Sequence, residues 1–157
     1  MEPRIRLDID KKQGALVKAA QGLLDEFDMM EVFHGKEHPL RNVLNVSLSA
    51  QCVEVVTNFV RYQCGRVEHE NASWRKLDKK TNKRMFADAL VHALEADNGA
   101  VKTHTKDIVG QAGGTDLERE VAAQLARQFM GYLVRYHRYL VPAKRSPRTG
   151  RTSAERS

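Results

Sequence analysis

Apolar residues recur at helical spacing in several long stretches of the chain. The first covers residues 11–33, where intervals of three and four place one apolar stripe along a helix: Leu16, Ala20, Leu23, Phe27 and Met30. Gly35 closes this helix. Pro39 suits the first turn of the next one, because the N–H that proline lacks has no partner within a helix at that position.

The second stretch, residues 39–66, also favours helix, either continuous or broken near residues 47–51. Its density of valine and phenylalanine would suit a strand as well. The run lacks strict alternation, however, and it ends in Gly65, which tolerates the left-handed conformation that often follows a helix. We therefore predict helix here.

Residues 68–83 are largely polar, with one large aromatic residue, Trp74, and carry many lysines and arginines, which is typical of a loop leading into a helix. A clean apolar stripe follows and ends before Asn98 and Gly99: Phe86, Ala89, Leu90, Ala93 and Leu94. Residues 99–114 contain four glycines and few apolar residues. They predict a connection with at most a short helix at residues 105–109.

The last helix opens with Thr115 and Glu118, a capping-box pair in which each side chain satisfies the free backbone N–H of the other. An apolar stripe then runs along it: Leu117, Val121, Leu125, Phe129, Leu133 and Tyr136. Pro142 ends it. We therefore expect an all-α fold, a single helical bundle of about five helices over residues 1–142, followed by a flexible basic tail at residues 143–157.

Composition agrees with one globular domain. The 157 residues are 41% hydrophobic and 29% charged, close to the average for soluble proteins. No apolar run approaches the roughly 18 residues of a membrane span, so we expect no membrane partner and a cytoplasmic protein. The two cysteines, Cys52 and Cys64, do not form a Cys-x-x-Cys pair, which argues against a disulfide framework and against a four-ligand zinc site.

The net charge of +6 points to a polyanionic partner. Four of these charges lie in the tail, where five basic residues face one acid, so residues 1–142 carry only +2. A nucleic acid would therefore bind the body of the protein through a local patch.

Catalytic patterns are weak. His34 and His38 have the spacing of two metal ligands on a helix, but Gly35 and Pro39 argue against a helix there. Cys64 lies on an apolar helix face, where a core role is favoured over a nucleophile. The glycines at 110–114 precede a helix, yet Asp116 would repel a phosphate. We expect no enzyme, metal or cofactor. A hydrolase with an unrecognised site, motivated only by the six histidines, is a rival hypothesis.

The arginines indicate a possible function more clearly than the candidate catalytic residues do. Arg61 and Arg66 border the end of the second helical stretch, and Arg127, Arg135 and Arg138 recur along the last helix among tyrosines. Arginine can hold a nucleic-acid backbone by bidentate contacts to phosphate while aromatic rings stack on unpaired bases. The alternative is a solvated face on which these arginines pair with nearby acids.

Three segments together resemble one known family. They are residues 40–44 (LRNVL), 59–66 (FVRYQCGR) and 129–139 (FMGYLVRYHRY). In order and approximate spacing they are similar to the small helical subunit of type III CRISPR RNA-guided interference complexes, the Csm-type subunit of III-A systems and its III-D relatives. The segments at 74–84 and 99–114 are longer than in that family, and the tail beyond Pro142 inherits no role from it.

The resemblance implies a non-catalytic subunit in antiviral defence, stacked in several copies along the guide-RNA backbone filament. Its implied partners are guide RNA, target RNA, the backbone and large subunits, and further copies of itself. Carried onto matching positions, the implied RNA-binding residues are Arg41, Arg61, Arg66, Arg135, Tyr136, His137 and Arg138. The alternative is a helical protein-interaction adaptor without direct RNA contact.

Overall fold

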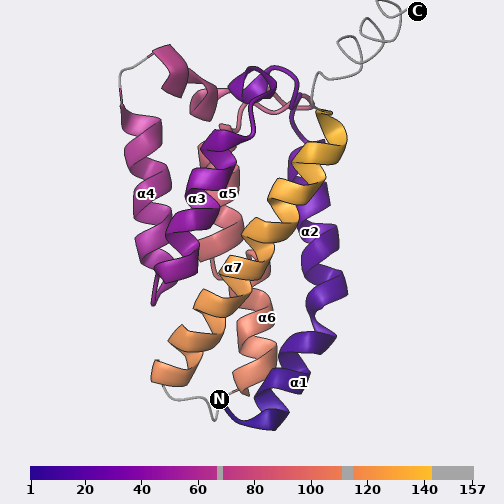
Figure 1. Ribbon diagram of the computed structural model, residues 1–157, viewed down its shortest axis with the longest axis vertical. Coiled ribbons are helices and arrows are strands. Elements are labelled where there is room, and N and C mark those ends of the chain that lie inside the picture. Colours follow the sequence, from indigo (N-terminus) through magenta and orange to yellow (C-terminus); the bar gives the residue numbers. More distant parts are fainter. Residues whose placement is uncertain (67–68, 111–114, 143–157) are drawn as a thin grey trace, which may run out of the picture.

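Helices account for almost all regular structure in the chain. The computed structural model describes residues 1–66, 69–110 and 115–142, and within these ranges it contains helices and no β-strand. The α-helices are α1 (Pro3–Lys11), α2 (Gln13–Asp25), α3 (His38–Ser49), α4 (Val53–Gly65), α5 (Phe86–Glu95), α6 (Ala100–Val109) and α7 (Thr115–Leu140). Two short 3-10 helices, η1 (Val32–Gly35) and η2 (His69–Arg75), complete it. The expected all-α bundle is confirmed (Figure 1).

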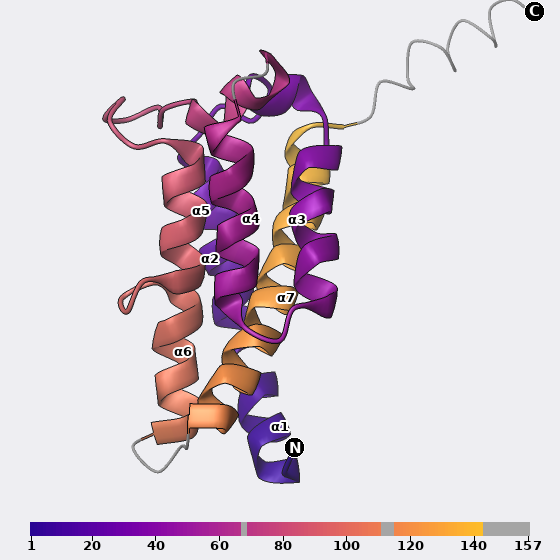
Figure 2. The same ribbon diagram turned by 90° about the vertical axis from the view of Figure 1, so that its left-hand side faces the viewer.

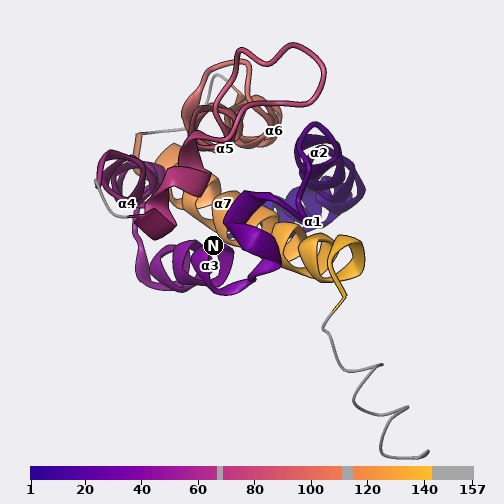
Figure 3. The same cartoon turned by 90° about the horizontal axis from the view of Figure 1, so that it is seen from above.

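The long helix α7 forms the centre of the bundle. It packs against α2, α3 and α6, and it buries a nearly continuous apolar stripe. On the far side of α3, α4 packs between α3 and α5 (Figures 2 and 3). Helices α2, α4 and α7 end at the same end of the bundle at which α3 and α5 begin (Figure 1).

The helix expected at residues 11–33 has the wrong boundaries. The chain breaks at Lys12, and α2 already ends at Asp25. Beyond it the backbone turns, and three successive residues, Phe33, His34 and Gly35, have positive φ angles of 59°, 54° and 76°. Phe33 is nonetheless buried at 3% exposure. Phe27 is buried as well, whereas Met30, the last residue of the expected stripe, is 55% exposed. The folded turn therefore packs Phe27 and Phe33 into the core, and the prediction is wrong for Met30.

The second helical stretch is broken rather than continuous, at the turn between α3 and α4. Arg127 of α7 donates a hydrogen bond from Nη1 to the carbonyl oxygen of Ala50 at 3.3 Å. That carbonyl follows the last residue of α3, so the arginine satisfies a backbone acceptor that has no partner within a helix.

The connection expected at residues 99–114 is wrong over its first part, because α6 occupies ten of these residues. α6 buries three residues at helical spacing: Val101, Thr105 and Ile108. In the sequence this short stripe is a weaker signal than the four glycines around it. A Cβ atom on Gly99 would lie 2.1 Å from the carbonyl oxygen of His92. Gly99 thus allows α6 to begin directly against the end of α5.

Both ends of α7 agree with the sequence, since it begins at Thr115 and ends at Leu140, before Pro142. The glycines at 111–114 and the basic tail at 143–157 lie outside the described residues. Among the helices of the described part, none combines the length and apolar character needed to cross a lipid bilayer.

Four aromatic rings close the end of the bundle where α5 begins. The ring of Phe86 lies 5.1 Å from that of Phe27 and 5.6 Å from that of Phe33, both edge to face, and Phe33 packs at 4.8 Å against Trp74. Trp74 is only 2% exposed. The one large aromatic of the polar segment therefore anchors that segment to the core.

Candidate nucleic-acid interface

Arg41 and Arg138 meet on one carboxylate. Arg41, in the first turns of α3, donates to Glu37 Oε2 at 2.7 Å, and Arg138, at the end of α7, donates to both oxygens of Glu37 at 3.2 Å. Burial works to raise the pKa of Glu37, but the hydrogen bonds from the two arginines outweigh it and leave the pKa below its usual 4.5. Two of the candidate arginines are thus brought together, with a shared acid between them.

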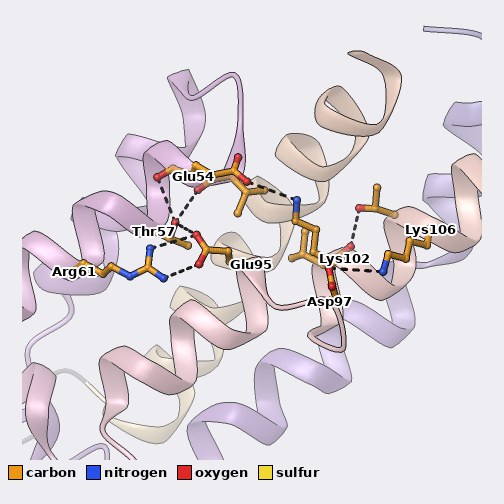
Figure 4. Close-up of polar contacts among 10 residues, drawn as sticks. Glu54, Thr57, Arg61, Glu95, Asp97, Lys102 and Lys106 are labelled. Atoms are coloured by element: carbon orange, nitrogen blue, oxygen red, sulfur yellow. Dashed lines mark hydrogen bonds and ion pairs between the residues drawn. The ribbon is translucent and has the colours of Figure 1, made fainter. Parts of the chain in front are cut away.

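Arg61 carries a carboxylate partner of its own. Its Nη2 lies 2.6 Å from Glu95 Oε2, its Nη1 lies 3.3 Å from Oε1, and the Thr57 hydroxyl donates to Oε1 at 2.7 Å (Figure 4). The hydrogen bond from Arg61 lowers the pKa of Glu95, and the same bond raises the pKa of Arg61. This ion pair joins α4 to α5, so for Arg61 the structure agrees with the paired, solvated-face alternative.

Two other arginines lie over tyrosine rings. The guanidinium carbon of Arg66 is 5.8 Å from the centre of the Tyr62 ring, and that of Arg135 is 5.6 Å from the centre of the Tyr132 ring. Arg66 also donates to Gln63 at 3.3 Å. A cation over an aromatic face keeps its charge, so Arg135, which has no ion pair with a described residue, can still bind a phosphate.

Tyr136 and His137 differ sharply in exposure. Tyr136 donates its hydroxyl to Asp25 at 2.7 Å, which raises the pKa of the tyrosine, and its ring stacks on that of Tyr139 at 5.8 Å. His137 is 1% exposed. Burial lowers the pKa of His137 below its usual 6.5. Its imidazole therefore faces the interior rather than solvent.

The candidate arginines form two groups rather than one continuous track. Arg41 lies near the start of α3, and Arg135 and Arg138 lie near the end of α7. Arg61 lies in α4 and Arg66 directly follows it, and α4 lies across α3 from the end of α7 (Figures 1 and 3). Of these residues, the structure brings Arg41 and Arg138 together on Glu37, whereas Arg61 pairs with Glu95 and Arg66 lies over Tyr62.

A basic segment that the sequence marked only as a loop connects η2 to α5 at the same end of the bundle. We call residues 76–85 the lysine loop. Its frame is the buried carboxylate of Asp78, which accepts hydrogen bonds from the backbone N–H groups of Thr81, Lys83 and Arg84 at 2.7, 3.1 and 3.0 Å. These bonds, first that from Thr81 and then that from Arg84, hold the pKa of Asp78 well below its usual range. The carboxylate thus stays charged and braces the loop.

The lysine loop displays three cations without partners. Lys79, Lys80 and Lys83 are exposed, and their ammonium groups form no ion pair or hydrogen bond with any described residue. The backbone of the loop is tied to α2, because the N–H of Lys79 donates to the carbonyl oxygen of Glu26 at 2.8 Å. The loop is therefore held next to the end of α2.

We call this end of the molecule the basic end. It combines the lysines of the loop, Lys76 among them, with cations and one aromatic ring from neighbouring elements: Lys36, Arg135, Arg138 and Tyr139. The Tyr139 ring is 75% exposed and offers a stacking surface for an unpaired base. The signal that could have revealed the loop was the run of lysines beside a buried tryptophan.

The described residues contain no candidate metal site, and the comparisons with known proteins identify no relative. Over residues 1–66, 69–110 and 115–142, no three His, Cys, Asp or Glu side chains gather as they would around a metal ion. Comparison with protein families, with curated proteins and with solved structures finds no match to the chain.

The paired acids predict a stability that depends on pH. Because Glu37 and Glu95 have lowered pKa values in the folded state, the stabilisation from their ion pairs is present above pH 4.5 and is lost as the pH falls below it through the folded-state pKa values. We expect Glu95→Gln to remove part of the difference between urea unfolding at pH 7 and at pH 3. A coupling with Arg61→Gln of about 0.2–1 kcal/mol is expected at pH 7, and a coupling that does not shrink as the pH is lowered through the range in which the folded protein takes up protons would contradict the assignment.

Removing the brace of the lysine loop should loosen it locally. Asp78→Ala leaves three backbone N–H groups without their acceptor, so we expect faster amide hydrogen exchange at Thr81, Lys83 and Arg84 and a lower melting temperature. Asp97→Ala, which removes an exposed carboxylate near α6, is the matched control. Unchanged exchange at the three amides would show that Asp78 does not hold the loop.

Proposed function

We propose that the chain is a non-catalytic RNA-binding subunit of a type III CRISPR effector complex. Several copies stack along the guide-RNA backbone filament, and each holds guide or target RNA by its phosphates. Sequence is read by base pairing with the guide, because contacts to phosphates carry no base information. The work of the protein is to neutralise and position a strand in the cytoplasm.

The observation that carries the proposal is the lysine loop, with three unpaired cations on a braced segment. Lysines on a loop whose backbone is already held in place bind phosphates at a smaller entropic cost than lysines on a flexible loop. The three segments that resemble the family also reach the same end of the bundle, through the start of α3 and the ends of α4 and α7 (Figures 1 and 2). Both lines of support thus point to the basic end.

A protein-interaction adaptor is the second candidate, and one observation favours it. Leu48 and Val55, on either side of the turn between α3 and α4, are 62% and 49% exposed. Exposed aliphatic side chains at one turn suit a contact with another protein. A neighbouring copy in a filament would use the same contact, so Leu48→Lys should weaken assembly under either role. The two roles differ in RNA binding: an RNA-binding subunit keeps its salt-sensitive binding of free RNA in this variant, whereas an adaptor shows none in either form.

The proposal is tested by equilibrium binding of the full chain to two single-stranded RNAs of equal length and different sequence. We expect affinities that agree between the RNAs and that fall steeply with salt, by about 0.7 in log–log slope for each phosphate contact. Expression beside type III subunits and a guide RNA should yield a particle that contains the chain. Salt-insensitive assembly without RNA would instead establish the adaptor.

A further inference from the structure

Three tyrosines and one arginine follow one face of α7 towards its end. Tyr132, Tyr136 and Tyr139 lie four and three residues apart, so their side chains share that face. Exposure rises along it, because the first two tyrosines are half-buried and Tyr139 is 75% exposed. Arg135 lies between them, with its guanidinium carbon 5.6 Å from the centre of the Tyr132 ring. Rings that alternate with a cation on one helix face are typical of a surface that binds single-stranded nucleic acid.

The last two rings form a stack that is ordered without a ligand. The centres of the Tyr136 and Tyr139 rings are 5.8 Å apart, and the ring planes differ by 22°. The hydroxyl of Tyr136 donates to Asp25 at 2.7 Å, which holds this inner ring against the end of α2. The inner ring covers one face of Tyr139, and the other face is open because most of the residue is exposed. A base that stacks there extends an ordered pair of rings, which lowers the entropic cost of binding.

The ring stack and the lysine loop are attached to consecutive residues of the chain. Asp25, the last residue of α2, accepts the hydroxyl of the inner ring, and the carbonyl oxygen of Glu26 accepts the N–H of Lys79 at 2.8 Å. Consecutive Cα atoms are about 3.8 Å apart. One strand can therefore place its phosphates on the lysines and a base on Tyr139. The acid of Glu26 does not oppose this, since it pairs with Arg84 at 3.8 Å.

We infer that Tyr139 stacks on an unpaired base of the bound strand, a contact that the basic end makes with single-stranded RNA and not with a duplex. Within a duplex each base is covered on both faces by its neighbours, whereas the lysines reach the phosphates of either form. Every base has a π-face, so the contact needs no particular sequence. The inference rests on the proposed function and deepens it, because it names the unpaired strand as the RNA that the chain holds.

The first test compares two strands of equal length and charge: an oligouridine RNA, and the same backbone with a stable abasic analogue at every position. We expect the full wild-type chain to bind the oligouridine about fivefold more tightly or better, at about 0.1 M salt. Tyr139→Ala should bind both strands alike, with the weaker affinity. Tyr139→Phe keeps the ring and removes only the hydroxyl, so it should restore the preference for the strand with bases.

Tyr62→Ala is the matched control. Tyr62 is a tyrosine of α4 that is 62% exposed, and its ring stacks on no other aromatic ring of the described residues. This variant should keep the wild-type preference, and neither alanine variant should lower the melting temperature, because both side chains are exposed. The inference is overturned if Tyr139→Ala keeps the preference, if the wild type has none, or if Tyr62→Ala loses it equally.

A second measurement reports on the stack itself. A single 2-aminopurine within the oligouridine loses fluorescence when an aromatic ring stacks on it. Binding of the wild type or of Tyr139→Phe should therefore quench this base, and binding of Tyr139→Ala should leave it bright. After the strand is annealed to its complement, the wild type and Tyr139→Ala should bind it equally. A duplex that loses affinity in Tyr139→Ala would contradict the restriction to unpaired bases.

The outcomes also distinguish this inference from the proposed function. Salt-sensitive binding that is equal for strands with and without bases overturns the stacking contact and leaves the RNA-binding subunit in place. A chain that binds neither strand overturns the proposed function, and the inference with it. If Tyr139→Ala then weakens assembly with other proteins, the exposed ring belongs to a protein contact, as the adaptor requires.

Discussion

Charge reversal at Lys79, Lys80 and Lys83 should lower the affinity for single-stranded RNA about 100-fold at about 0.1 M salt. The three ammonium groups have no described partner, so each is free to neutralise one phosphate. Losing three contacts should also reduce the slope of log affinity against log salt by about 2. Fluorescence anisotropy with a labelled RNA, at several salt concentrations, measures both quantities.

A matched variant controls for net charge. Arg4→Glu, Arg6→Glu and Lys18→Glu alter three exposed residues of α1 and α2 that also form no ion pair in the described part of the chain. Either triple reversal takes the formal net charge from +6 to zero, since each reversal removes two charges. The control should bind RNA far more tightly than the lysine-loop variant. Equal losses would show that the affinity follows total charge rather than the basic end.

Gly99→Ala should destabilise the fold by about 1–3 kcal/mol or more. The added Cβ would lie 2.1 Å from the carbonyl oxygen of His92 and 3.1 Å from those of Ala93 and Ala96, all of them backbone atoms that cannot turn aside. Relief requires α6 to move away from the end of α5. We expect the melting temperature to fall by about 2–4 °C for each kcal/mol lost.

Gly22→Ala, in contrast, should raise the free energy of unfolding. Gly22 lies inside α2, and a Cβ there meets nothing within 4 Å. Alanine has the higher helix propensity, so this variant should gain about 0.5–1 kcal/mol. Urea unfolding of the two variants beside the wild type checks both signs. An unchanged stability of Gly99→Ala would contradict the close approach of α5 and α6.

Helical periodicity in the sequence predicted the fold class well because burial determines it. The stripe from Leu117 to Tyr136 identified α7, and Pro142 identified its end. Periodicity failed where apolar residues pack without a helix, as at Phe33, whose positive φ no spacing reveals. It also failed at Gly99, because glycine is common both in loops and where two backbones come close together.

The candidate site was harder to predict because pairing is a tertiary property. Nothing in the sequence places Glu37 beside Arg138, 101 positions away, or Glu95 beside Arg61. Some basic residues also satisfy the backbone: Arg75 donates to the carbonyl oxygen of Cys64 at 3.1 Å, close to the end of α4. Asp78, the acid within the lysine loop, accepts hydrogen bonds from backbone N–H groups, and Lys79, Lys80 and Lys83 form no ion pair with any described residue.

Photo-crosslinking of a bound single-stranded RNA to the full chain, followed by peptide mass spectrometry, tests most directly whether the folded body holds a strand at its basic end. We predict adducts on residues 76–85 and on the end of α7, around Arg135 and Tyr139. Adducts confined to residues 143–157, or concentrated on α1 and α6 at the opposite end of the bundle, would contradict the account.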